Sequence, residues 1–311
     1  MQLRLDRIRK EYGDKVAVND LSLEVPEGVI YGVIGPNGAG KTTTIRMIMN
    51  ITAPDSGRVL IDGRPPDGSF LNRVGYLPEE RGLYKKMTVS EVLTYLAELK
   101  GYPASKARAD MVPWLERVNL AEYQNSKVEE LSKGMAQKLQ FVSTILHQPD
   151  LLILDEIFSG LDPLNMELLK DIMMEQKRAG RTILFSTHVM EQAEKLCDHV
   201  CMIASGNKVI DGRLGDVKAQ FGRNCIHLEI EGDGGFIRAL PGVKDVLEFN
   251  NYQELALEDG ADSQAILREL VGRVKVLRFD VIEPSLYDIF IDMARIDPSQ
   301  LVADPEGGSH V

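Results

Sequence analysis

The sequence is poor in cysteine and in aromatic residues. Its 311 residues include three cysteines and one tryptophan, and aromatic residues make up 6% of the chain. So few cysteines provide no disulfide framework, which is consistent with a reducing cytosol. Cys197 and Cys201 flank His199. We expect no closed set of metal ligands there, because a helix is predicted to run directly into a strand at this point.

Long apolar runs and an excess of positive charge are also missing. No run approaches the roughly 18 apolar residues that span a bilayer, and the first residues, MQLRLDRIRKEYG, do not contain the apolar core of a signal peptide. We therefore expect any action at a membrane to pass through a partner protein. The 36 Lys and Arg against 47 Asp and Glu give a net charge of −11. This argues against a nucleic-acid binder with a broad basic face.

The length of the chain predicts about two domains. Over residues 1–218, apolar strands alternate with helical stretches. This pattern predicts an α/β domain whose mostly parallel sheet is covered on both faces. A helix-rich insert is expected at about residues 88–147, where Thr88 and Glu91 form a capping box ahead of apolar positions with helical spacing.

The pattern changes in residues 222–297. Strands and helices follow in the order β-α-β-β-α-β, which predicts a small ferredoxin-like α+β domain. Ser285 is expected to cap its last helix. The lone His227 lies on an alternating strand and is expected to face solvent. Residues 298–311 are expected to form a disordered tail.

A glycine-rich stretch, GPNGAGKTT, matches the pattern G-x-x-x-x-G-K-[ST] between an apolar strand and a helix. Its glycines let the backbone curl so that N–H groups point at phosphates, and the helix that begins at Lys41 directs its positive end at the same anion. Lys41 supplies an ammonium group, and the Thr42 hydroxyl is expected to bind Mg²⁺. The predicted nucleotide contacts in this loop are Gly35, Pro36, Asn37, Gly38, Ala39, Gly40, Lys41, Thr42 and Thr43.

The stretch LLILDE supplies acidic groups at the end of a buried strand. Asp155 lies at the sheet edge where α/β folds bind ligands and is expected to hold Mg²⁺. Glu156 is expected to orient or deprotonate an attacking water. A guanine-reading N-K-x-D is missing, because Ile210 stands at the acidic position. Tyr12 is suited to stack on adenine, so the sequence favours ATP.

These motifs occur in the order found in the ATP-binding subunits of ABC transporters, which the chain resembles over almost the whole first domain. The matching elements are Tyr12, GPNGAGKT, LPEE, LSKGM, LLILDE, SGLD and STH. The resemblance implies a head-to-tail dimer with a second copy or a homologous ATPase subunit, in which each ATP lies between the phosphate loop of one chain and the LSKGM helix of the other. Ser132 and Gly134 would then bind the γ-phosphate of the partner's ATP. Asp162 would lie at the dimer centre, and His188 would contact the γ-phosphate and support Glu156.

Two residues depart from the family pattern. The usual signature L-S-G-G-Q reads LSKGM here, so Met135 replaces the glutamine that makes one contact in the family, although Gln137 stands nearby. Glu79 occupies the usual glutamine position of the Q-loop. A carboxylate can still bind Mg²⁺ or its water, so we expect Glu79 to alter Mg²⁺ dependence and coupling rather than to abolish hydrolysis.

Two longer stretches resemble a narrower group of export-type subunits, which includes sodium-extrusion and drug- or peptide-efflux systems. They are GYLPEERGLYKKMTVSEVLTYLAELKG and EPSLYDIFI. The resemblance implies an ATPase, peripheral on the cytoplasmic face of the inner or plasma membrane, that powers export of an ion, drug, lipid or peptide through a polytopic permease. Tyr84 and Met87 either form an apolar socket for a permease helix or pack between the two lobes.

Two other functions compete with transport. A soluble ABC ATPase acting on ribosomes or DNA would carry two ATPase domains, a coiled-coil insert or a zinc module, and none of these is evident in the sequence. We expect no nucleic-acid partner. A non-hydrolytic binding protein is disfavoured because the residues expected to act on ATP are all present, namely Lys41, Asp155, Glu156 and His188.

Overall fold

The computed structural model describes residues 1–80, 82–221, 225–258, 260–282 and 284–296. The tail expected at residues 298–311 lies outside the described residues. The described chain divides into two compact units, residues 1–213 and residues 214–296.

The first unit is built on a six-stranded sheet with the order β5-β6-β7-β3-β8-β9. Its strands are β5 (Val74–Leu77), β6 (Leu151–Asp155), β7 (Thr182–Thr187), β3 (Ile30–Ile34), β8 (His199–Ala204) and β9 (Asn207–Arg213). All neighbours are parallel except β8 and β9. Every residue of β3, β6 and β7 is buried, as expected for inner strands of a parallel sheet. The predicted α/β fold is confirmed.

The first unit also contains an antiparallel sheet, which the sequence pattern did not distinguish from the parallel sheet. Its order is β2-β1-β4, with β1 (Leu3–Tyr12), β2 (Lys15–Val25) and β4 (Ser56–Ile61). Leu3, Leu5 and Ile8 of β1 are buried in the same core as Tyr31 of β3. This shared core holds Tyr12, the last residue of β1, in the same rigid unit as the parallel sheet.

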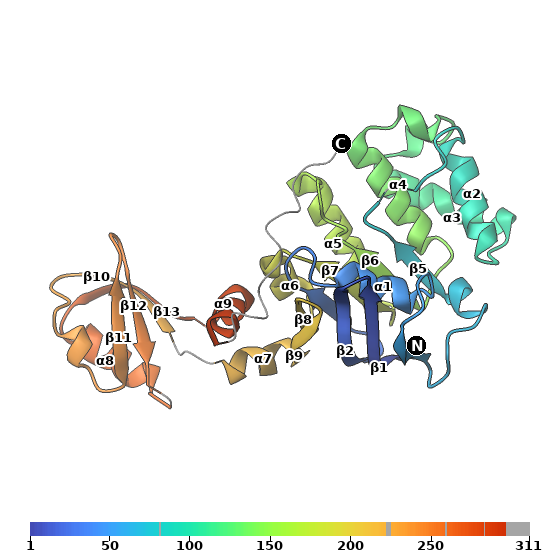
Figure 1. Ribbon diagram of the computed structural model, residues 1–311. Helices are drawn as coiled ribbons and strands as arrows, with labels where there is room; N and C mark the ends of the chain where they lie inside the picture. Colours follow the sequence, from blue (N-terminus) through green and yellow to red (C-terminus); the bar gives the residue numbers. More distant parts are fainter. Residues whose placement is uncertain (81, 222–224, 259, 283, 297–311) are drawn as a thin grey trace. The chain divides into compact units, whose positions relative to one another are not determined.

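The helices of the first unit form two groups. The first group comprises α1 (Lys41–Ile48), α5 (Pro163–Arg178) and α6 (Met190–Leu196). The second group, packed together at the upper right of Figure 1, comprises α2 (Val89–Leu99), α3 (Ala104–Arg117) and α4 (Lys133–Ile145). The 3-10 turns are η1 (Phe70–Arg73), η2 (Ala121–Tyr123) and η3 (Val128–Glu130). The predicted capping box at α2 is confirmed, since Thr88 Oγ1 accepts from the N–H of Glu91 and a Glu91 carboxylate oxygen accepts from the N–H of Thr88.

The second unit has the predicted ferredoxin-like order of elements. It contains α7 (Leu214–Gln220), β10 (Cys225–Glu231), η4 (Ile237–Ala239), β11 (Val243–Glu248), β12 (Gln253–Leu257), α8 (Ser263–Val271), β13 (Lys275–Ile282) and α9 (Leu286–Ile296). The antiparallel sheet has the order β11-β12-β10-β13. The first expected helix is reduced to the single turn η4. Ser285 Oγ accepts from the N–H of Asp288 at 3.1 Å, so the predicted cap of α9 is confirmed.

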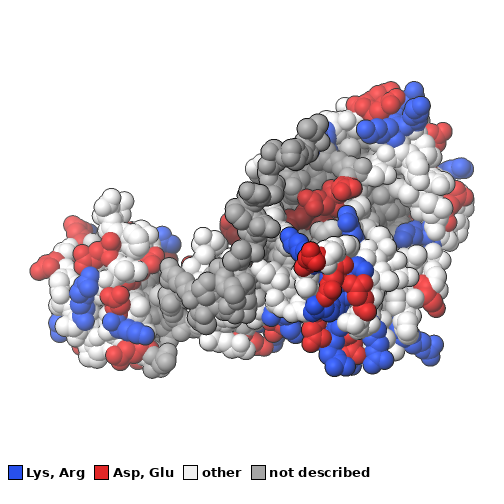
Figure 2. All heavy atoms as spheres, in the orientation of Figure 1, with Lys and Arg blue, Asp and Glu red and all other residues white. Residues whose placement is uncertain are grey.

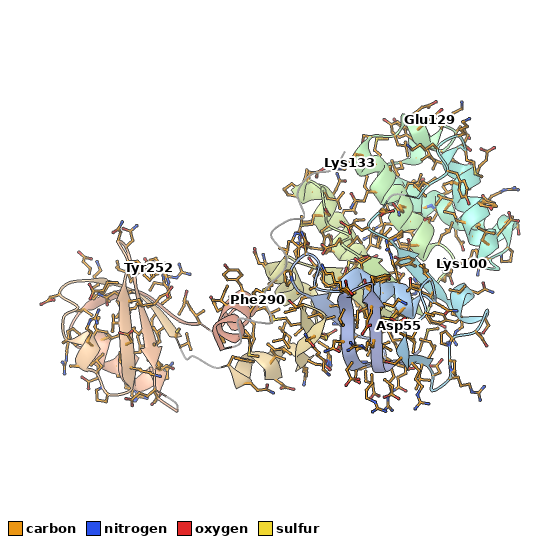
Figure 3. All side chains as sticks on the ribbon, in the orientation of Figure 1. Asp55, Lys100, Glu129, Lys133, Tyr252 and Phe290 are labelled. Carbon is orange, nitrogen blue, oxygen red and sulfur yellow. The ribbon has the colours of Figure 1, made fainter. Side chains whose placement is uncertain are left out.

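The expectation for His227 is wrong. Its side chain is only 17% exposed, and its Nε2 lies 3.2 Å from a carboxylate oxygen of Glu229. The ring stacks on that of Tyr252 with 4.3 Å between centroids (Tyr252 is labelled in Figure 3). The sequence missed this contact because Tyr252 comes from the turn before β12, and only strand pairing brings it beside β10.

The cysteine-rich stretch around His199 is part of the core. Cys197 and Cys201 are both buried, and burial raises the pKa of both thiols. Within the part of the chain that the structure describes, no group of three or more His, Cys, Asp or Glu side chains could hold a metal ion. In that same part, no helix combines the length and apolar character needed to cross a membrane.

His147, just beyond the end of α4, gives a test of the fold by pH. Its Nε2 lies 3.2 Å from the backbone oxygen of Val74, and burial lowers its pKa from 6.5 to about 4. Because the folded pKa lies below the unfolded one, protonation favours the unfolded chain. Stability is therefore lost as the pH falls from about 6.5 to about 4.

Replacing His147 with glutamine puts an amide N–H donor near Val74 in place of the ring nitrogen and removes the titration. Between pH 7 and pH 5, we expect the variant to lose about 2 kcal/mol less unfolding free energy than the wild type. Urea unfolding followed by the fluorescence of Trp114, the single tryptophan, reports on the first unit. Equal losses in the two proteins would contradict the assignment of this pH dependence to His147.

Candidate nucleotide site

A hollow of about 600 Å³ in the first unit collects most of the residues that the sequence predicts to contact nucleotide. It is lined by residues 37–43 together with Tyr12, Glu79, Glu156 and His188. These residues come from the end of β1, the β3–α1 loop, the first turn of α1 and the segments after β5, β6 and β7. Because β3, β5, β6 and β7 are parallel, their carboxyl ends meet at one edge of the sheet, where α/β folds bind ligands.

The β3–α1 loop requires glycine for two different contacts. Gly35 has φ +151°, and a Cβ there would lie 2.0 Å from the backbone oxygen of Ile203. Gly40 has φ +106°, and a Cβ there would lie 2.3 Å from the backbone oxygen of Ala17. The loop is therefore pressed against β8 and β2, and α1 starts directly behind it. The N–H groups of the first turn of α1 have no partner within the helix, which makes this end suitable for an anion.

Lys41 is held in a position from which it can reach a phosphate. Its side chain is 6% exposed, and Nζ donates to the backbone oxygens of Gly35 at 2.9 Å and Pro36 at 3.1 Å. Nζ also lies 3.5 Å from Glu156 Oε1. Gly35 and Pro36 do not line the hollow. In this structure their backbone oxygens hold the Lys41 ammonium group.

Asp155, at the end of β6, has the features of a Mg²⁺ ligand. It is 1% exposed, and its Oδ1 accepts from the Ser186 hydroxyl, while its Oδ2 is buried with no partner. Burial raises the pKa of Asp155, and hydrogen bonds from Ser186 and Thr42 oppose this. A buried carboxylate oxygen without a partner fits a cation beside the Thr42 hydroxyl. Because Mg²⁺ commonly uses one or two carboxylates and otherwise water and phosphate oxygens, the site needs no larger set of acidic residues.

Glu156 is positioned by its backbone and by His188. Its φ of +49° places it in the left-handed region, which costs a residue other than glycine on the order of 1 kcal/mol. Its N–H donates to the Ser186 hydroxyl oxygen at 3.2 Å. One carboxylate oxygen faces His188 Nδ1 at 3.0 Å, and the other faces Lys41. This turn directs the carboxylate into the hollow.

The remaining wall of the hollow is open to solvent. Tyr12 is 50% exposed, and Lys10 Nζ lies 5.6 Å from its ring centroid. One ring face is thus occupied by a cation, and the ring is otherwise accessible for stacking. Glu79 is exposed and also lines the hollow. Lys15, Ala17 and Ser159 also line the hollow, but they lie outside the motifs or carry no distinctive chemistry, so the sequence gave no reason to select them.

The structure does not bring Ser132 and Gly134 to this hollow. Ser132 caps α4, with its hydroxyl accepting from the N–H of Met135 at 3.3 Å. Gly134 lies in the first turn, and the nearest atom to a Cβ there would be Asn165 Nδ2 at 3.9 Å. No packing within the described chain requires glycine at this position. Lys133, labelled in Figure 3, marks the same end of α4.

Asp162 also lies away from the hollow. It caps α5, with its carboxylate accepting from the N–H of Asn165 at 2.9 Å, and this hydrogen bond lowers the pKa of Asp162. Gln137 does not face outward, so it does not replace the glutamine that the signature lacks. Its side chain is buried, and Nε2 donates to the backbone oxygen of Ile157 at 2.6 Å.

A phosphate loop between β3 and α1, beside acidic residues at the end of β6, defines a P-loop nucleoside triphosphatase. The model of the ABC transporter family matches residues 18–159, and the model of the ATP-binding protein DrrA1-3-like, C-terminal domain, matches residues 212–294. The chain belongs to the family of ABC transporter ATP-binding proteins.

Similar proteins support this membership over most of the chain. The uncharacterized ABC transporter ATP-binding protein YhaQ of Bacillus subtilis (strain 168) is 44% identical, with 93% of this chain and 97% of YhaQ covered. The Nod factor export ATP-binding protein I of Burkholderia orbicola (strain AU 1054) is 40% identical over 66% of this chain and 68% of its own. A solved structure of an ATP binding subunit of an ABC transporter covers 71% of this chain and 94% of its own, with 34% identity and a TM-score of 0.67.

Proposed function

We propose that this ABC transporter subunit hydrolyses ATP to power export of a substrate through a separate membrane permease. Membership of the family implies ATP hydrolysis, and several relatives are named as export ATP-binding proteins. The arrangement of Lys41 and Glu156 around one hollow, with Asp155 beside Glu156 at the adjoining hollow, supports hydrolysis in this chain. The second unit, which we propose to be an accessory domain, carries no cluster of metal-ligating groups among its described residues.

The proposed chemistry assigns one role to each group at the hollow. Lys41 would exchange its ion pair with Glu156 for the phosphates of ATP. Glu156, held by His188, would then orient an attacking water or accept its proton. Thr42, Asp155 and Glu79 would hold Mg²⁺, which when bound neutralises charge on the phosphate oxygens.

The observation that carries the proposed dimer is the position of the N-terminal end of α4, which includes Ser132 and Gly134 and is called the signature end below. Ser132 and Gly134 present a hydroxyl and an uncrowded backbone at a helix N-terminus, yet they lie outside the hollow of their own chain. A second copy placed head to tail would present this end to ATP. Asp162, exposed at the start of α5, would then lie near the dimer centre.

A second hollow, of about 560 Å³, is our proposed contact for the permease. It lies on the helical group and is lined in part by Met87, Thr94 and Tyr95. Tyr84, 48% exposed, packs edge-on against Tyr95. Exposed aromatic side chains beside a partly apolar hollow suit a helix from a partner. Through this contact the chain would sit on the cytoplasmic face of the membrane.

Co-purification tests the transport proposal. The tagged chain carrying Glu156→Gln, which is expected to hold the ATP-bound state, would be isolated from membranes in mild detergent. We expect a stoichiometric polytopic membrane protein to come with it, and we expect Tyr84→Ala combined with Tyr95→Ala to reduce its yield. Leu247→Ala, which changes an apolar side chain that is 56% exposed on β11 of the second unit, is the matched surface control.

Recovery only from the soluble fraction with ribosomal or DNA-associated partners would overturn the transport proposal. The surface gives little support to that alternative. Figure 2 shows acidic and basic side chains interspersed over β1 and β2 on the viewed face, and several of them pair, including Arg58 with Asp6 and Lys10 with Asp55. Paired charges are poorly placed to neutralise nucleic-acid phosphates.

A further inference from the structure

Helix α4 holds the segment that carries Glu156 through a buried side chain. Gln137 is 7% exposed, and its Nε2 donates to the backbone oxygens of Ile157 at 2.6 Å and Ser159 at 3.4 Å. These are the first and third residues after Glu156. The N–H of Ser159 in turn donates to the backbone oxygen of Glu156 at 3.0 Å, so a single turn links the Gln137 amide to Glu156.

The same helix end carries the groups expected to meet a second chain. Gln137 follows Ser132 by five residues, less than two turns of helix. A rigid helix transmits a displacement of its first turn to its second, because its backbone hydrogen bonds fix the spacing between them. Any movement of Ser132 and Gly134 therefore also moves the donor that holds Ile157 and Ser159.

A hollow of about 410 Å³ next to the nucleotide hollow shows where such a movement would act. It is lined in part by Gln137, Gln140, Asp155 and Glu156. Gln140, one turn further along α4, donates weakly to the backbone oxygen of Glu80 at 3.4 Å. The segment after β6, residues 156–159, borders this open space and can shift there without a steric clash. Its position therefore depends on the hydrogen bonds from Gln137.

We propose that Gln137 is a positioning residue that couples the signature end of α4 to Glu156 of the same chain. In the proposed dimer, on which this inference rests, the signature end contacts the ATP bound by the partner. Gln137 then makes hydrolysis at one site depend on occupancy of the other. The coupling runs within one polypeptide, from Ser132 and Gly134 through Gln137 to the carbonyls that follow Glu156.

Replacing Gln137 with leucine removes the donor and keeps the side chain at a similar size. The carbonyls of Ile157 and Ser159 then lose a buried donor, so the segment that follows Glu156 is held less firmly. We expect the kcat for ATP to fall about tenfold and the Hill coefficient to fall towards 1. Affinity for a fluorescent ATP analogue is expected to change less than about twofold, because Gln137 does not line the nucleotide hollow.

The matched control is Gln176→Leu on α5. Gln176 is a buried glutamine, 5% exposed, that lines neither hollow. Because its Oε1 is buried without a hydrogen-bond partner, we expect this variant to keep the unfolding free energy, the kcat and the Hill coefficient of the wild type. If Gln137→Leu does not fold, Gln137→Asn, which keeps the amide but shortens its reach by one methylene group, is measured in the same way with the same expectation.

Failure of this inference can be told apart from failure of the proposed function. If a Glu156→Gln chain with Gln137 intact forms no ATP-dependent dimer, the proposed function is wrong. If that dimer forms, but Gln137→Leu or Gln137→Asn hydrolyses ATP with the kcat and Hill coefficient of the wild type, only the coupling role is wrong. If kcat falls equally in Gln137→Leu and in the Gln176→Leu control, Gln137 only stabilises the fold and has no coupling role.

Discussion

Replacing Glu156 with glutamine is expected to lower ATP turnover by about 10²-fold or more, because loss of a positioned general base commonly costs that much. The amide keeps the size of the side chain and can still hydrogen-bond to His188, which lies 3.0 Å from the present carboxylate. ATP binding should persist. The substitution removes the negative charge 3.5 Å from Lys41 Nζ, so it leaves this ammonium group free for phosphate. Phosphate release and light scattering with ATP and Mg²⁺ would measure turnover and the dimer expected to accumulate.

Lys41→Ala provides the contrasting variant. It removes the ammonium group that the Gly35 and Pro36 carbonyls hold at the phosphate loop. We expect it to lose nucleotide affinity, so that neither turnover nor a dimer is seen. Turnover at the wild-type rate in Glu156→Gln would show that another group activates water and that the assignment of Glu156 is wrong.

Replacing Gly134 with aspartate is expected to abolish the ATP-dependent dimer while leaving the single chain intact. The space around Gly134 is open, with Asn165 Nδ2 3.9 Å from an added Cβ, and an acidic residue in the first turn of a helix is favourable. In the proposed dimer, however, the new carboxylate would face the partner's γ-phosphate. Such a like-charge contact costs several kcal/mol, so we expect turnover to fall about 10²-fold or more.

The measurement combines Gly134→Asp with Glu156→Gln and follows dimer formation by light scattering. Binding of a fluorescent ATP analogue to the single chain should stay within about twofold of the wild type. Gly68→Asp is the matched control, since Gly68 is exposed with nothing within 4 Å of an added Cβ. Normal dimerisation of the Gly134→Asp chain would contradict the head-to-tail arrangement.

Much of the nucleotide hollow could be predicted from the sequence because its chemistry lies in short contiguous motifs. A loop of glycines followed by Lys41 has few conformations available between a strand and a helix. The acidic pair that includes Asp155 follows a buried strand directly. Parallel strands bring their carboxyl ends to one edge of the sheet, so motifs that follow such strands are expected to lie near that edge.

Contacts between distant segments could not be predicted in the same way. Ser186 hydrogen-bonds to Asp155 because β6 and β7 are neighbours in register, and nothing in the STH motif to which Ser186 belongs indicates this partner. His227 is shielded by Tyr252, although both lie on strands or turns that suggest exposure. Gln137 looked like a candidate for an outward contact, yet it points to Ile157. In each case the partner is set by packing across the fold.

The sequence by itself determined the α/β class, the phosphate loop, the acidic residues after β6 and the ferredoxin-like order of the second unit, because these depend on local spacing and apolar periodicity. Only the tertiary structure decided which groups share a hollow. It set the left-handed turn at Glu156, left Asp155 Oδ2 without a partner and placed Ser132 and Gly134 outside the hollow. These features depend on the relative positions of segments far apart in the chain, and such positions are fixed by burial and by hydrogen bonds between strands and helices.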